Sequence, residues 1–239
     1  MIHYQGMKKS KKLCMLVLIG MMVCTISSIS SQTISPSSTQ SANDISRHFS
    51  ISLIPDSIQH LIKGKSYKAD CTIPMNDLRY IRCLHITAEG QTKEGEMIVN
   101  KKIARQVKEI LYQLYINRYP IESIQLIDHW NADDEQSMRA NNSSAFNFRY
   151  ISHTKKVSKH GYGMAVDINP LYNPYHKRLK NGKEVVEPAT ARPYLNRKKA
   201  FKYKIEADDL CCRLFKKYGF SWGGNWKTMK DYQHFEANF

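Results

Sequence analysis

Two segments of the chain carry apolar residues at helical spacing. The first runs from Lys101 to Asn117, with one apolar face formed by Ile103, Val107, Ile110, Leu111 and Leu114. Residues three or four apart share one side of a helix, so this pattern predicts an amphipathic helix that Pro120 ends. The second helix is predicted from Ile205 to Tyr218, with an inward face of Ala207, Leu210, Cys211, Leu214 and Phe215. Gly219 follows it, where a helix end favours a residue that adopts positive φ.

Short apolar runs bounded by turn residues predict strands. They are Glu94–Val99, Ile121–Ile127, Phe146–Ile151, Gly163–Ile168, Phe220–Trp226 with a glycine turn, and Asp231–Glu236. Residues 44–90 are expected to form short strands and a helical turn, while 131–144 and 176–199 are polar and expected to be surface loops. Helices and strands do not alternate regularly. The pattern therefore predicts an α+β fold with a mainly antiparallel sheet and flanking helices.

The N-terminal residues have the pattern of an export signal. Four lysines between positions 8 and 12 precede the apolar run Leu13–Cys24, and a Ser/Thr-rich stretch follows. The run is shorter than the roughly 20 residues that span a bilayer. We expect a signal peptide or N-terminal anchor at 1–31, a flexible spacer at 32–43 and one domain at 44–239, whose recognisable core is 140–239. The protein would then be exported to the periplasm or cell envelope, either soluble or anchored by its N-terminus.

The chain is strongly basic, with 36 Lys+Arg against 21 Asp+Glu and a net charge of +15. Leaving out the four signal lysines lowers this to about +11. Such a charge favours anionic partners, and an anionic cell-wall surface is the natural one for an exported protein. The sequence contains no zinc-finger, basic-zipper or RNA-binding strand motif, so no nucleic acid is expected as a partner. We expect a monomer.

Four cysteines lie outside the predicted signal. Cys71 and Cys83 are close enough in sequence for a hairpin to join them, and export would permit a disulfide. Cys211 and Cys212 are adjacent on the second predicted helix and are expected to be small buried apolar residues.

The residues that indicate a chemistry lie in two separate stretches, Ser158–Asp167 and Asp231–His234. They supply two imidazoles, His160 and His234, and two carboxylates, Asp167 and Asp231. Three protein ligands, an open position and a nearby base make up a catalytic zinc site. Glycines at 161 and 163 permit a bend that turns His160 back toward Asp167. Asp231 and His234 are three apart, so the strand must break near Gln233 to bring them together.

The motif Ser158-x-His160-x-x-Gly163-x-Ala165-x-Asp167 resembles that of the zinc D-alanyl-D-alanine carboxypeptidase and dipeptidase family, which includes L-alanyl-D-glutamate endopeptidases. The pair Asp231 and His234 resembles the second motif of this family. The stretch after the ligand aspartate is similar to its VanY-like branch. The resemblance covers about 140–239 and implies a hedgehog-like peptidase fold with the metal site at the sheet.

The resemblance also implies roles for single residues. His160, Asp167 and His234 would bind one zinc ion, and Asp231 would be the general base. An upstream arginine would offset charge on the attacked carbonyl, with Arg149 the first choice and Arg139 the second. Residues expected to contact substrate are Ser158, Arg139, Tyr232 and Trp226, although core packing is the alternative for the aromatic residues. Glu236 and Ser158 are candidates for the groups that orient the ligand histidines.

The expected function is zinc-dependent hydrolysis of a peptide bond in peptidoglycan stem peptides. D-alanyl-D-alanine carboxypeptidase is the first specificity and L-alanyl-D-glutamate endopeptidase the second. A non-catalytic zinc-containing wall-binding module is a different class of function, and so is a basic nucleic-acid-binding protein of the envelope. Asp231 argues against the non-catalytic module, because a structural zinc site has no use for a free carboxylate beside it.

Overall fold

A computed structural model of the chain describes residues 44–151 and 154–238. The predicted signal and spacer lie outside the described residues, which all belong to one compact unit spanning 37–239. Helices and antiparallel sheets are intermixed, which confirms the α+β class. Within the described ranges, no helix has both the length and the apolar character needed to cross a bilayer.

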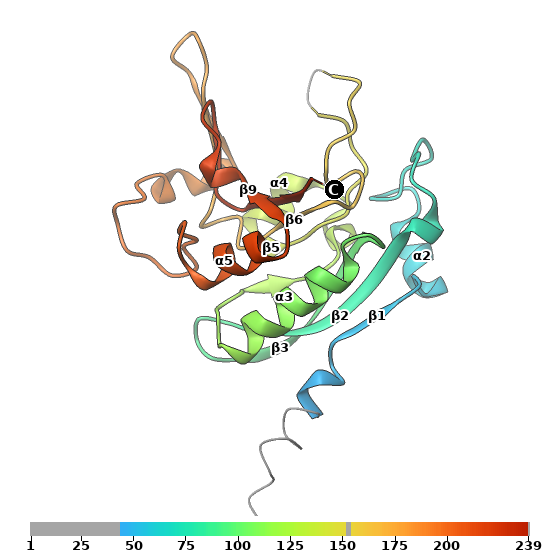
Figure 1. Cartoon of the computed structure of the whole chain (residues 1–239). Coiled ribbons are helices and arrows are strands. Elements are labelled where there is room, and N and C mark those ends of the chain that lie inside the picture. Colours follow the sequence, from blue (N-terminus) through green and yellow to red (C-terminus); the bar gives the residue numbers. More distant parts are fainter. Residues whose placement is uncertain (1–43, 152–153, 239) are drawn as a thin grey trace, which may run out of the picture. The chain divides into compact units, whose positions relative to one another are not determined.

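The N-terminal sheet consists of β1 (Ser50–Ser52), β2 (Leu78–Ile86) and β3 (Thr92–Asn100), all antiparallel. The connection from β1 to β2 contains α2 (Asp56–Ile62) and the 3-10 turn η1 (Met75–Asp77). Helix α3 (Ala104–Ile116) follows β3 and covers one side of the sheet (Figure 1). All five apolar residues of its predicted face are buried, because they pack against the sheet and the C-terminal elements.

The C-terminal sheet has the order β6 (Ala165–Asp167), β11 (His234–Ala237), β9 (Phe220–Trp222) and is antiparallel. Helix α5 (Leu210–Lys217) begins at the cap Asp209, whose carboxylate accepts a hydrogen bond from Cys212 N–H at 2.7 Å. Ala207 therefore lies before the helix and is exposed, in contrast to the prediction. Gly219 has a φ of +87°, as expected for the residue after a helix end.

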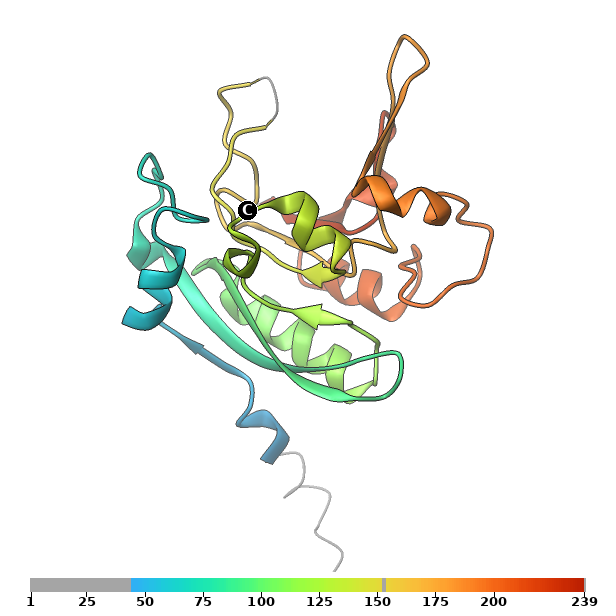
Figure 2. The same cartoon turned by 180° about the vertical axis from the view of Figure 1, so that it is seen from behind.

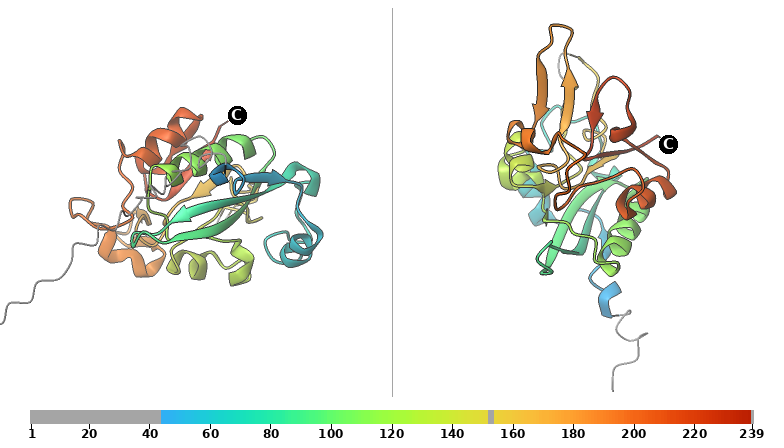
Figure 3. Two further views of the ribbon diagram at one scale, coloured as in Figure 1. Left: turned by 90° about the horizontal axis from the view of Figure 1, so that it is seen from below. Right: turned by 90° about the vertical axis from the view of Figure 1, so that its left-hand side faces the viewer.

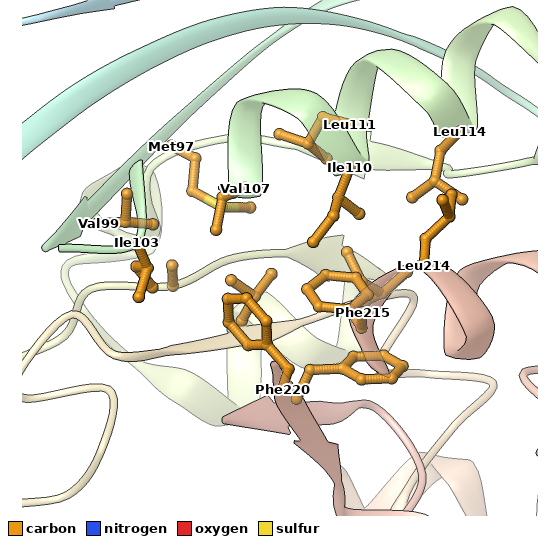
Figure 4. Close-up of a cluster of buried hydrophobic side chains, with 14 of the residues drawn as sticks. Met97, Val99, Ile103, Val107, Ile110, Leu111, Leu114, Leu214, Phe215 and Phe220 are labelled. Atoms are coloured by element: carbon orange, nitrogen blue, oxygen red, sulfur yellow. The ribbon is translucent and has the colours of Figure 1, made fainter. Parts of the chain in front are cut away.

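One apolar core joins the two sheets. Side chains of α3 face Leu214, Phe215 and Phe220 across the core (Figure 4). The rings of Phe215 and Phe235 stack with their centres 4.1 Å apart, which ties α5 to β11. The core therefore fixes the strand that carries His234 at its start.

The polar segment 131–144 is not a loop. It contains α4 (Asp134–Arg139), which begins where the Asp133 carboxylate accepts a hydrogen bond from Gln136 N–H. The 3-10 turn η2 (Ile127–Trp130) precedes α4, and β5 (Asn142–Ser143) follows it and pairs in parallel with β4 (Ser123–Ile124). Figure 3 shows α3 and α4 on opposite sides of the β2–β3 hairpin.

A third sheet stands where an exposed loop was expected at 176–199. Strands β7 (Tyr175–Arg178) and β8 (Glu184–Glu187) form a hairpin, and β10 (Lys230–Asp231) pairs with β7. The hairpin extends away from the core (Figure 2). The 3-10 helix η3 (Ala189–Tyr194) follows it. The loop prediction was wrong because exposed lysines and arginines hide the strand pattern.

Two strand predictions differ from the structure, one in length and one in kind. The run 121–127 forms only the two-residue strand β4. Residues 146–151 form no strand ladder, although Phe146 and Phe148 are buried, because their N–H groups bond to Ile98 and Ser66 in different parts of the fold.

Cys71 and Cys83 are free thiols in the structure, so the pairing that the sequence permits is not formed. Cys83 lies in the core under α3, whereas Cys71 packs in a separate apolar cluster beside α2. Cys211 and Cys212 are fully buried, as predicted for small apolar residues.

Candidate metal centre

The C-terminal sheet places Asp167 beside His234. Asp167 ends β6 and His234 begins β11, and the two are direct partners in the antiparallel register. Directly opposite residues point to the same face of a sheet, so the carboxylate and the imidazole meet there. The His234 Nδ1 atom is 3.1 Å from Asp167 Oδ1.

His160 reaches the same point from a tight turn. The Ser158 hydroxyl accepts a hydrogen bond from Gly161 N–H, and Gly163 N–H donates to the His160 carbonyl. Gly163 has a φ of +65°, a left-handed conformation that glycine adopts without steric cost. Its carbonyl accepts from Asn100 N–H at 2.8 Å, which anchors the turn to the end of β3. The expected bend is therefore present.

The three side chains form a triangle of possible ligand atoms. His160 Nε2 is 3.1 Å from His234 Nδ1 and 3.2 Å from Asp167 Oδ2. Ligand bonds of about 2.0–2.1 Å in a tetrahedral zinc site put neighbouring ligand atoms about 3.3 Å apart. The two imidazole nitrogens have nearly this spacing, and each faces one oxygen of the Asp167 carboxylate, so the residues fit a zinc ion.

The far nitrogen of each imidazole has its own acceptor. His160 Nδ1 donates to the carbonyl of Ala145 at 2.7 Å, which leaves Nε2 free to act as a ligand. His234 Nε2 lies 3.2 Å from a Glu236 carboxylate oxygen, so its Nδ1 faces the triangle. Such outer hydrogen bonds set the tautomer and orientation of metal-binding histidines. Glu236 thus occupies the position proposed for it, and the Ala145 carbonyl was missed because no sequence pattern marks a backbone acceptor.

The charges around the triangle also suit a cation. Burial disfavours charge on His234, but its hydrogen bonds to Asp167 and Glu236 outweigh burial and raise its pKa to about 10. Burial opposes ionisation of Asp167 as well, yet the two histidines hold its pKa well below the usual value. Both shifts favour a positive charge on His234 next to the negative charge of Asp167, and a bound metal ion would supply that positive charge instead.

Asp231 lies beside the triangle without being part of it. Strand β10 ends at Asp231, and strand β11 begins at His234 after the two connecting residues Tyr232 and Gln233. The two strands belong to different sheets, and Asp231 and His234 lie where these sheets meet. Within the described structure, Asp231 Oδ1 is buried and has no hydrogen-bond partner. Burial raises the pKa of Asp231 to about 7, with the negative charge of Asp167 adding to the effect. A carboxylate in this state is suited to exchange protons near neutral pH.

The aromatic residues divide into two kinds. The Trp226 ring centre lies 5.3 Å from that of His234 and the residue is half-buried, so it forms a wall of the site. Tyr232 packs instead under the Arg197 guanidinium, 4.4 Å from its ring centre, and its carbonyl accepts a hydrogen bond from Trp222. These contacts of Tyr232 stabilise the connection between β10 and β11 that precedes His234. Contact of Tyr232 with substrate stays a prediction.

The two candidate arginines lie in different surroundings. Arg149 is partly exposed and pairs with Asp134 at 2.5 Å. Arg139 pairs with Glu135 on α4 and lines a hollow with Leu171 and Tyr172, whose lining includes none of the three ligand residues. Arg149 remains the better candidate for a role at the site. Ser158 is buried within the His160 turn, and its predicted contact with substrate stays untested.

Replacing Glu236 with Ala should weaken zinc binding about 10- to 100-fold, because the His234 ring loses the acceptor that orients it. Titration of the metal-free protein with zinc measures this change. Glu94→Gln, which removes a surface carboxylate paired with Arg82, is the matched control and should bind zinc like the wild type. Equal zinc affinity of the Glu236→Ala protein and the wild type would contradict the orienting role.

Comparison with known proteins agrees with this geometry. A protein-family model described as D-alanyl-D-alanine carboxypeptidase matches residues 152–237. The matched region contains all three candidate ligands and Asp231. No solved structure matches the chain. Residues 152–237 are therefore similar to the D-alanyl-D-alanine carboxypeptidase family.

Proposed function

We propose that the protein is a zinc peptidase that removes the terminal D-alanine from peptidoglycan stem peptides. The observation that carries this proposal is the triangle of His160, Asp167 and His234 with Asp231 beside it, whose buried Oδ1 has no hydrogen-bond partner among the described residues. Three ligands and a separate base are what hydrolysis requires, whereas a purely structural site would use a fourth protein ligand. The family match supports the peptidase class.

The residues of the chain have distinct parts in this reaction. When bound, zinc lowers the pKa of a coordinated water toward about 7 and polarises the attacked carbonyl. Asp231 accepts a proton from the attacking water and delivers it to the leaving amine as the C–N bond breaks. Burial raises its pKa toward neutrality, which suits a group that first accepts and then donates a proton. Trp226 covers one side of His234 and limits the access of bulk water.

Negative charge develops on the carbonyl oxygen during the attack. Arg149 is the residue we assign to offset it, since it is partly exposed and lies on the chain segment that leads to His160. A well-placed donor of this kind contributes about 3 kcal/mol in comparable sites. The Asp134 carboxylate holds the guanidinium in place before substrate binds.

A second specificity, cleavage between L-alanine and D-glutamate, uses the same residues and differs only in where the peptide lies. The alternative of a non-catalytic wall-binding module leaves the burial of Asp231 without a purpose. We further propose that the protein is exported and acts at an anionic cell wall, on the basis of its N-terminal sequence and its net charge of +15.

The test is digestion of defined muropeptides by the purified protein, with and without a metal chelator, followed by mass spectrometry. The proposal predicts chelator-sensitive loss of one terminal alanine. Cleavage after the first alanine would instead establish the endopeptidase. The absence of any chelator-sensitive product would contradict the peptidase proposal.

A further inference from the structure

The small sheet aligns three side chains that start at the candidate base. Tyr175 on β7 is the register partner of Asp231 on β10 and also of Glu187 on β8. Directly opposite residues of antiparallel strands point to the same face, so Asp231, Tyr175 and Glu187 form one row across the sheet. Strands lie about 4.8 Å apart, which puts the Glu187 backbone about 10 Å from that of Asp231.

The electrostatics of Tyr175 agree with this row. Burial raises the pKa of the Tyr175 phenol, and the negative charges of Glu187 and Asp231 raise it further. The phenol also donates a hydrogen bond to the sulfur of Met229, which lies directly before the start of β10 at Lys230. The Tyr175 ring therefore lies between the candidate base Asp231 and Glu187 on this face of the sheet.

Charge is unbalanced at the Glu187 end of the row. The groups that act electrostatically on Glu187 are Arg149, Glu135 and Asp134. Each of the two acids on α4 already has a partner, because Asp134 pairs with Arg149 and Glu135 with Arg139. Glu187 is solvent-accessible and makes no ion pair with any residue in 44–151 or 154–238. Three carboxylates and two guanidinium groups leave one negative charge uncompensated.

We infer that Glu187 determines specificity by binding the side-chain ammonium of the diamino acid in the stem peptide. The inference rests on the proposed function. In a stem peptide the diamino acid comes directly before the D-alanyl-D-alanine end, one residue from the cleaved bond. An extended chain advances about 3.3–3.6 Å per residue, and a lysine-like side chain of four methylenes adds about 6 Å. The ammonium thus reaches up to about 10 Å from the reacting carbonyl, a span comparable to the backbone-to-backbone length of the row.

Tyr175 and Glu187 would contact different portions of the diamino acid side chain. The methylene groups of the diamino acid lie along the Tyr175 ring, and the ammonium meets the carboxylate beyond it. Glu187 touches a part of the substrate that does not react. The contact is the same before and during the reaction, so its loss should appear in KM and leave kcat unchanged.

The experiment compares two pentapeptides that end in D-alanyl-D-alanine, one with lysine at the third position and one with Nε-acetyl-lysine. The zinc-loaded full chain should cleave the lysine peptide with about tenfold lower KM, since acetylation removes the charge. Glu187→Gln should raise KM for the lysine peptide about tenfold and leave the acetylated peptide unaffected. Glu184→Gln is the matched control, because Glu184 lies on the same strand but on its opposite face, near His176.

Loss of the lysine preference in Glu187→Gln alone supports the inference. Equal KM values for the two peptides in the wild type, or an unchanged preference in Glu187→Gln, would overturn it and leave the peptidase proposal intact. Cleavage of neither peptide by the zinc-loaded wild type would overturn the proposed carboxypeptidase and the inference with it.

Discussion

Asp231→Asn should lower kcat about 10²- to 10⁴-fold while the protein keeps one bound zinc ion. The amide has the shape of the carboxylate but cannot accept the proton from the attacking water. Asp231 is not one of the three residues whose ligand atoms converge, so its replacement leaves the triangle complete. Turnover of a stem peptide and the zinc content of the same preparation, measured together, check both halves of this result.

The matched control for this change is Asp208→Asn, which neutralises an exposed aspartate before α5. It should alter neither turnover nor zinc content. Full activity of Asp231→Asn would remove Asp231 from the mechanism. Loss of zinc together with activity would assign it a ligand role instead.

Gly163→Ala should lower the free energy of unfolding by about 2–5 kcal/mol. A side chain at a left-handed φ costs about 1–2 kcal/mol. In addition, a Cβ at Gly163 would lie 2.8 Å from the backbone nitrogen of Asn100, and backbone cannot move aside as a flexible side chain can. Crowding of this kind costs about 1–3 kcal/mol. The shift also displaces the turn that carries His160, so zinc affinity should fall. Denaturant unfolding and zinc titration measure the two effects.

Gly182→Ala separates the two causes. Gly182 has a φ of +82° at the tip of the β7–β8 hairpin, and a Cβ there would meet nothing within 4 Å. This variant should lose only about 1–2 kcal/mol, the cost of the left-handed conformation. If both variants lose the same free energy of unfolding, the contact with Asn100 does not contribute to the effect of Gly163→Ala.

The sequence predicted best those elements whose apolar residues have a clear period. Helix α3 and the end of α5 follow directly from spacing and from Gly219. Helix α4 is short and polar, so the spacing of apolar residues does not indicate it. The signal for it in the sequence is the cap residue Asp133. The β7–β8 hairpin is held partly by β10, more than forty residues further along the chain, and no local pattern reports such a pairing.

The candidate ligands could be named from the sequence because glycines and a family motif surround them. Their mutual geometry could not, since it depends on the register of Asp167 with His234 and on the anchoring of the His160 turn to β3. The row that ends at Glu187 could not be predicted from the sequence either, because the polar residues of 176–199 indicate a loop. A role for a residue such as Glu187 can thus be inferred only when the long-range strand pairing is known.

Zinc titration of the metal-free protein, compared with His234→Ala, tests the central claim most directly. The claim is that His160, Asp167 and His234 together hold one divalent ion. It predicts one tightly bound zinc per wild-type chain and an affinity at least 100-fold weaker in the variant, since one of three protein ligands is gone. Equal zinc affinity of the two proteins, or no stoichiometric binding by the wild type, would contradict it.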